Sequence, residues 1–140
     1  MTTVNDWNTQ IINEFRANEG RVGGRFEGRT MLLLHHKGAK SGQERVNPLV
    51  YLKEDGSDVM YVFASKGGAP TNPDWYYNVK ANPDVTVEVG TEKYDATAEV
   101  ITGPERDRIW KANVAVNPGF GEYEEKTTRT IPVIALRRKS

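Results

Sequence analysis

The chain has 140 residues, with 19 basic and 19 acidic side chains, and therefore no formal net charge at pH 7. This length predicts a single domain over residues 1–140. The absence of cysteine excludes thiolate nucleophiles, iron–sulfur clusters and cysteine-based zinc sites, and it favours a reducing cytoplasm. Residues 1–30 contain no apolar stretch long enough for a signal peptide or a membrane span.

The charges are unevenly distributed along the chain. Residues 21–53 hold seven basic and two acidic side chains, an excess of five positive charges. A nucleic-acid-binding domain is usually basic throughout. The local excess therefore indicates a site for an anionic small molecule and argues against nucleic acid as a partner.

The first predicted element is a short amphipathic helix within residues 1–20. Its apolar residues share one face: Trp7, Ile11, Ile12 and Phe15. We expect Asn5 or Asp6 to cap its start. The apolar face has two interpretations, a cap or lid over the domain or a contact with a membrane surface. Because Arg16 is the only base in this segment, attraction to anionic lipid would be weak, which favours the cap.

The rest of the chain, over residues 30–136, predicts a core built mainly from strands. We expect these strands at 31–36, 46–52, 59–64, 85–89, 94–100 and 131–136. A helix is predicted over 75–80, with Asn72 as N-cap and Pro73 in its first position.

A further helix is predicted to start at Pro104, followed by a loop around Phe120 and Tyr123. Four side chains of this helix are expected to point inward: Ile109, Trp110, Ala112 and Val116. Five or six strands in hairpins with a few short helices predict an α+β fold, a small antiparallel barrel.

The basic loop KGAKSGQER, residues 37–45, is the first candidate for chemistry. It places three bases, one hydroxyl and two glycines between two strands, and such a loop can offer backbone N–H groups and charged donors to a phosphate. It is not a Walker loop, because the glycine spacing and the order of Lys and Ser differ. The alternative is a solvent-exposed basic turn.

The second candidate is the segment SKGGAPTNPDWYYN, residues 65–78. Two glycines beside Ser65 and Lys66, followed by a helix start that carries Trp75 and Tyr76, can frame a planar ligand. The alternative is an aromatic helix that plugs the core.

Other chemistries have less support. His35 and His36 are adjacent on a predicted strand and would point to opposite faces, so we expect no metal site. No serine lies in a GxSxG turn, which argues against a Ser/His/Asp triad. Tyr123 stands in a predicted loop without a periodic reason to be aromatic, which makes it a candidate for a substrate pocket.

Three segments, GAKSGQERVNPLVYL, FASKGGAPTNPDWYYNVKANP and TRTIPV, resemble the deazaflavin-dependent nitroreductase family over residues 31–136. The resemblance implies a split β-barrel that binds the reduced 8-hydroxy-5-deazaflavin coenzyme F-420. It also implies hydride transfer from this coenzyme to quinones, nitroaromatics or conjugated enones and lactones. The alternative is a carrier that binds the deazaflavin, or FMN, without turnover.

The resemblance also implies which residues bind the coenzyme. The phosphate would be held by Ala39, Lys40, Ser41 and Arg45. The ring system would be lined by Val46, Asn47, Pro48, Leu49 and Val50, and approached by Phe63, Ala64, Ser65 and Lys66. The segment Asp74, Trp75, Tyr76, Tyr77 and Asn78 would close over the ring. Arg21, Arg25, Lys37 and Lys66 would contact the anionic tail.

For the acceptor, the resemblance implies a pocket formed by Trp75, Phe120 and Tyr123. Ser65 and Tyr123 are the candidate catalytic residues, because a hydrogen-bond donor at the acceptor oxygen would stabilise developing negative charge. The nitroimidazole-activating relative is tyrosine-rich in the loop after its last helix. Asn117 and Phe120 stand there in this chain and only Tyr123 is retained, which counts against nitroimidazole activation.

Overall fold

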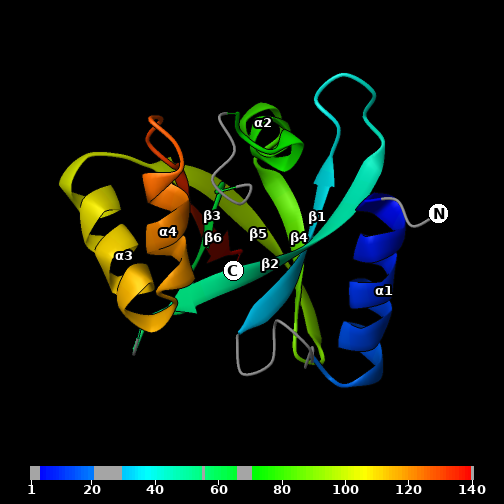
Figure 1. Cartoon of the computed structure of the whole chain (residues 1–140). Coiled ribbons are helices and arrows are strands. Elements are labelled where there is room, and N and C mark those ends of the chain that lie inside the picture. The colour runs from blue at the N-terminus through cyan, green and yellow to red at the C-terminus, as the bar shows by residue number, and fades with distance from the viewer. Residues whose placement is uncertain (1–3, 21–29, 55, 66–70, 140) are drawn as a thin grey trace.

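Six antiparallel strands form a closed barrel in the order β1-β2-β3-β6-β5-β4 (Figure 1). The computed structural model describes residues 4–20, 30–54, 56–65 and 71–139, with side chains from residue 9 onward. The strands are β1 Met31–Lys37, β2 Glu44–Lys53, β3 Met60–Phe63, β4 Asp84–Val89, β5 Glu92–Ile101 and β6 Val133–Arg138. The barrel with its flanking helices confirms the predicted α+β fold.

Alternating side chains fill the inside of the barrel. Val85 and Val87 of β4 and Ala96 and Ala98 of β5 are buried, whereas the residues between them face outward or are half-buried. This period of two is the pattern that predicted both strands. β1 differs, because its first six residues are all buried and its two faces are covered by the barrel core and by a helix.

Helix α1 (Val4–Ala17) covers the outer side of β1 and β2 (Figure 1). Ile11 and Phe15 are buried in one cluster with Met31 and Leu33. Beyond the helix, a Cβ on Gly20 would lie 2.7 Å from the Cα of Gly90, so only glycine permits this contact with the β4–β5 turn. The predicted capping by Asn5 or Asp6 is wrong, because both residues lie inside the helix.

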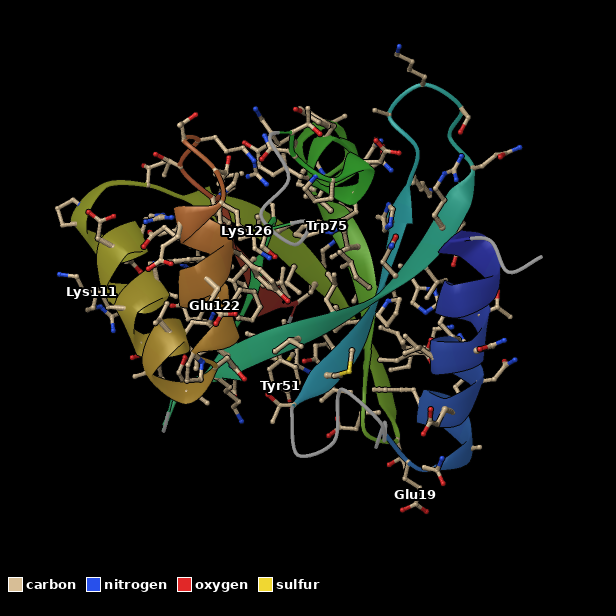
Figure 2. The ribbon with its side chains drawn as sticks, viewed as in Figure 1. Glu19, Tyr51, Trp75, Lys111, Glu122 and Lys126 are labelled. Carbon is tan, nitrogen blue, oxygen red and sulfur yellow. The ribbon has the colours of Figure 1, made fainter. Side chains whose placement is uncertain are left out.

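Helix α2 (Asp74–Ala81) packs against the barrel core. Trp75, Tyr76 and Val79 belong to the same buried cluster as the inward-facing strand residues, and Figure 2 shows Trp75 between the helix and the strands. The helix was predicted, but Asn72 does not cap it. Pro73 occupies the N-cap position without a side-chain cap, and the Asn72 Oδ1 accepts a hydrogen bond from Arg129 instead, at 2.7 Å.

Helices α3 (Gly103–Val116) and α4 (Gly119–Glu125) lie together on the side of the barrel away from α1 (Figure 1). Ile109 and Trp110 are buried as predicted and Ala112 is half-buried. The inward position predicted for Val116 is wrong, because 67% of that residue is exposed, whereas Asn113 is fully buried. None of the described helices is long and apolar enough to span a membrane.

The loop predicted around Phe120 and Tyr123 is wrong, because both residues lie in α4. Their spacing of three residues places them on one face of the helix, where their rings meet at 5.4 Å. Pro118 already has αR backbone angles at the N-cap. The proline and two glycines of this segment were read as loop signals, but the packing of one aromatic face against the barrel makes it helical.

Candidate functional site

The outer face of β2 beside the basic loop is apolar and is only partly covered by α1. We define the β2 face as the side chains of Val46, Pro48 and Val50, all half-buried. Val46 packs against the α1 cluster, and Val50 contacts both the α1 cluster and the α3–α4 cluster. Figure 1 shows β2 crossing the front of the barrel between α1 and α4. A planar ring could lie on this face.

The basic loop connects β1 with the upper end of β2 and keeps its charges available. Lys40, Ser41 and Arg45 are exposed, and neither base forms an ion pair with a described residue. The loop is tightly folded, because Gly42 N–H donates to the Gly38 carbonyl at 2.9 Å. A Cβ on Gly38 would lie 2.5 Å from the Ser41 Oγ, so a larger residue there would displace this hydroxyl.

A chain of hydrogen bonds with a buried centre ties the basic loop to β2 and α2. The Ala39 N–H donates to Asn78 Oδ1 at 2.9 Å. Asn78 Nδ2 lies 3.1 Å from His36 Nδ1, and His36 Nε2 lies 2.7 Å from Asn47 Oδ1. Three residues predicted to bind the coenzyme, Ala39, Asn47 and Asn78, are thus joined through one histidine that was not predicted.

Arg129 holds the chain that follows β3. Its Nη1 donates to the Ala64 carbonyl at 3.1 Å and to Asn72 Oδ1 at 2.7 Å. Its Nη2 donates to the Ser65 carbonyl at 2.8 Å. Burial lowers the pKa of the Arg129 guanidinium, which stays charged because an arginine pKa starts so high. The position of Ser65 therefore depends on an arginine 64 residues further along the chain.

The candidate acceptor residues Phe120 and Tyr123 lie in an aromatic cluster with Phe63 and Trp110. The rings of Phe63 and Phe120 are 5.5 Å apart, and those of Phe63 and Trp110 are 5.9 Å apart. Tyr123 is half-buried at the edge of this cluster. Ser65 follows Phe63 by two residues and is 8% exposed. The rings of this cluster are tilted or edge-on to one another. The cluster is apolar except for the buried Trp110 indole N–H and the Tyr123 hydroxyl at its edge.

Asn117 turns its carboxamide towards α3. Its Nδ2 donates to Asn113 Oδ1 at 3.0 Å, and both residues are buried. The NH₂ group of Asn117 is therefore already hydrogen-bonded within α3 and its C-cap.

The remaining predicted residues are spread more widely. Trp75 and Tyr76 are buried in the barrel core, as in the core-plug interpretation. Phe120 is buried as well, so Tyr123 is the half-buried one of the three residues predicted for the acceptor pocket. Tyr77 is 49% exposed and Asp74 is exposed in the first turn of α2. Leu49 packs against the inner cluster. Arg21, Arg25 and Lys66 lie outside the described residues.

An ionic network on the outside of the barrel fixes α1. Arg16 makes two hydrogen bonds to Glu88 of β4, the shorter at 2.7 Å. Hydrogen bonding to Arg16 is the main cause that holds the pKa of Glu88 at about 2. His35 lies between Glu88 and Glu44, at 2.5 and 2.8 Å. His35 and His36 therefore face opposite sides of β1, as their adjacency on a strand predicted.

Sequence reasoning missed His36 and Arg129 as parts of the site. Arg129 stands in the TRTIPV segment, which was recognised only as part of a resemblance. His36 was considered only as a metal ligand. Both residues contact partners that are distant in the sequence, and no local sequence pattern predicts such contacts.

The closed barrel of six antiparallel strands with its flanking helices defines the class of fold, a split β-barrel. The sequence model of the family described as "F420H(2)-dependent quinone reductase" matches residues 7–138, and the chain belongs to this family. This membership confirms the predicted enzyme class, a deazaflavin-dependent oxidoreductase, and the predicted coenzyme, reduced F-420.

Individual relatives agree with the family. A protein of Mycobacterium tuberculosis named as a quinone reductase of the same type is 39% identical over 129 residues, which are 89% of this chain and 85% of that protein. A solved F420-H2 dependent reductase, FDR-A, has 44% identity and a TM-score of 0.70, covering 78% of this chain and 95% of that one. A structure described as a domain-swapped dimer has 39% identity and a TM-score of 0.71, covering 96% and 100%.

Proposed function

We propose that this chain binds reduced coenzyme F-420 along the basic loop and the β2 face and reduces a quinone beside it. The observation that carries the proposal is a half-exposed apolar strand face, Val46, Pro48 and Val50, that begins at a loop with two bases that form no ion pair within the described part of the chain. The coenzyme would match these two parts, with its planar ring on the apolar strand face and its anionic tail at the basic loop.

The residues present fit this coenzyme. Lys40 and Arg45 are charged, exposed and free to form charge-assisted hydrogen bonds to a phosphate. The Ser41 Oγ accepts from the Gln43 N–H at 3.2 Å, which leaves its own proton to donate. The Ala39 N–H is already used by Asn78, so Ala39 would contribute by placing the loop rather than by binding phosphate.

When bound, the reduced coenzyme supplies a hydride from a ring carbon. The protein would orient the reactants and exclude water. Val46, Pro48 and Val50 would support the ring, while α1 and the Phe120–Tyr123 pair would border it on either side. The hydroxyls of Ser65 and Tyr123 are our candidate donors to the acceptor oxygen, because charge develops there as the acceptor is reduced.

We propose that flat, apolar acceptors are preferred, with quinones first and conjugated enones, lactones and nitroaromatics as further substrates. The cluster of Phe63, Phe120 and Tyr123 supports this preference, because aromatic rings favour flat partners. The Asn117 amide already donates to Asn113, and Phe120 has no hydroxyl, so only Tyr123 of the three residues at these positions could donate to an acceptor, which counts against bulky nitroimidazoles.

We also propose that residues 1–140 act as one domain, with α1 as a cover for the barrel. The burial of Ile11 and Phe15 against β1 supports a cover over a membrane contact, because these side chains are already occupied. A cysteine-free chain with an anionic coenzyme fits a cytoplasmic location.

The test is anaerobic reoxidation of reduced coenzyme F-420 by the purified chain with menadione, a nitroaromatic or a coumarin-type lactone. We expect turnover that depends on both protein and acceptor, fastest with the quinone. Tight coenzyme binding without turnover on any of the three acceptors would contradict the reductase and indicate a carrier.

A further inference from the structure

The hydrogen bonds from Ala39 to Asn47 form a chain whose orientation the structure determines. A backbone N–H can only donate, so the Asn78 atom that meets Ala39 N is the carbonyl Oδ1. The Asn78 atom that faces His36 is then the NH₂ nitrogen, which also can only donate. His36 Nδ1 must therefore be an unprotonated acceptor.

The direction of the hydrogen bond between His36 and Asn47 follows from the same rule. With Nδ1 unprotonated, the proton of a neutral imidazole sits on Nε2. His36 Nε2 then donates to Asn47 Oδ1 at 2.7 Å. Each group donates to the next, from the loop through α2 and β1 to β2. The Asn47 NH₂ is the last donor, and it faces no acceptor among the described residues.

The middle of the hydrogen-bond chain, between Asn78 and His36, is buried, and this makes its geometry costly to break. His36 is 2% and Asn78 is 7% exposed. Burial is the main cause that lowers the pKa of the His36 imidazole, in agreement with a neutral ring. A buried donor or acceptor that loses its partner costs more than an exposed one, because water cannot replace the missing hydrogen bond.

We propose that His36 is a positioning residue for the coenzyme phosphate: as the neutral Nε2–H tautomer it joins Asn78 to Asn47 and so fixes the loop that carries Lys40 and Ser41. The inference rests on the proposed function, because the loop is proposed to bind the phosphate. His36 acts through Asn78 and Ala39, since Ala39 directly precedes Lys40.

The neighbouring histidine offers a matched control. His35 has the same side chain on the same strand, but it faces Glu44 and Glu88 on the α1 side of the barrel. A replacement at His35 changes a histidine in β1, but it leaves intact the hydrogen bonds that run from Ala39 to Asn47.

The first experiment compares the affinity of the variants for two ligands, oxidised coenzyme F-420 and the same deazaflavin ring without its phosphate tail. We expect His36→Leu to bind the complete coenzyme about tenfold more weakly, the loss of about one buried hydrogen bond, and to bind the tail-free ring as the wild type does. His36→Asn keeps an acceptor near the Nδ1 position, so a smaller loss of about threefold is expected. His35→Asn should bind both ligands as the wild type does.

Unchanged affinity of His36→Leu for the complete coenzyme would overturn the inference. An equal loss for both ligands would also overturn it, because a general structural effect would not depend on the phosphate. If the wild type bound neither ligand, the proposed function would fail, and the role of His36 toward the phosphate would fail with it. Two measurements without coenzyme would then still decide whether His36 fixes the loop.

These measurements use the free protein. A long-range ¹H–¹⁵N NMR spectrum at neutral pH should show His36 protonated at Nε2 only, and a ring protonated at Nδ1 would overturn the assignment. Hydrogen exchange at the Ala39 amide should be about tenfold faster in His36→Leu than in the wild type. Equal exchange would show that the loop does not depend on His36.

Discussion

Replacing Arg129 should loosen the chain that carries Ser65 and should slow quinone reduction. Among the described residues, the guanidinium donates three hydrogen bonds, to the carbonyls of Ala64 and Ser65 and to the Asn72 side chain, at 2.7 to 3.1 Å. A hydrogen bond to a charged group contributes about 1.5 to 3 kcal/mol, and bonds that share one donor group are not additive. Arg129→Met should therefore lower the free energy of unfolding by about 2 to 4 kcal/mol.

Thermal melting and steady-state kinetics measure the two effects separately. A loss of about 2 to 4 kcal/mol corresponds to a fall in Tm of about 6 to 12 °C for a chain of this size. We expect kcat with menadione to fall by about tenfold, since a displaced donor at the acceptor oxygen costs at least that factor. Arg129→Lys keeps the charge but cannot reach three divergent acceptors, so it should show about half of the loss in Tm.

Arg137 provides the control for this experiment. It lies in β6, it is 45% exposed at its side chain, and its ion pair with Glu99 is 3.5 Å long. Exposed ion pairs of this kind contribute about 0 to 1 kcal/mol, so Arg137→Met should behave nearly as the wild type. If Arg129→Met matched Arg137→Met in both Tm and kcat, the role of Arg129 in holding Ala64 and Ser65 would be refuted.

Three further predictions concern coenzyme binding, the stability of the fold at low pH and reduction of the acceptor. Lys40→Ala with Arg45→Ala should weaken coenzyme binding by about 100-fold or more in a fluorescence titration, since each charge-assisted contact contributes about 1.5 to 3 kcal/mol; unchanged affinity would place the phosphate elsewhere. The pKa of Glu88 is lowered from 4.5 to about 2, mainly by its hydrogen bond from Arg16, so this carboxylate stabilises the fold above pH 4.5 and its contribution is lost as the pH falls towards 2. Urea unfolding of Glu88→Gln should accordingly show about 1 to 2 kcal/mol lower stability than the wild type at neutral pH, with the gap closing across that window; a constant gap would argue against the ion pair. Tyr123→Phe should lower kcat with menadione by about tenfold or more, and equal turnover would exclude this hydroxyl as the donor.

The strands could be predicted from local patterns because each buries one face. Val85 and Val87 alternate with more exposed residues in β4, and a period of two is visible in the sequence itself. α4 could not be predicted in this way, because Pro118, Gly119 and Gly121 are signals of a turn. Its helical form depends on Phe120 and Tyr123 packing against β3, a contact with residues nearly 60 positions earlier.

Only part of the candidate site could be predicted, because a local pattern shows neighbouring residues and not contacts between distant ones. The basic loop is contiguous, so its bases and glycines appear together in the sequence. The partners that position it are not contiguous, because Asn78 lies 39 residues after Ala39 and 42 after His36. Asn72 shows how a local rule can be overridden: it has the right side chain for an N-cap, but the charge of Arg129 binds its oxygen instead.

The most direct test of the account is a crystal structure of the chain with oxidised coenzyme F-420. The account predicts the phosphate within hydrogen-bond distance of Lys40 and Arg45, and the ring on Val46, Pro48 and Val50 between α1 and α4. A ring or phosphate bound instead in the pocket lined by His35, Asp84, Asp95 and Lys139, or at the opposite end of the barrel beside Tyr51 and Tyr94, would contradict it.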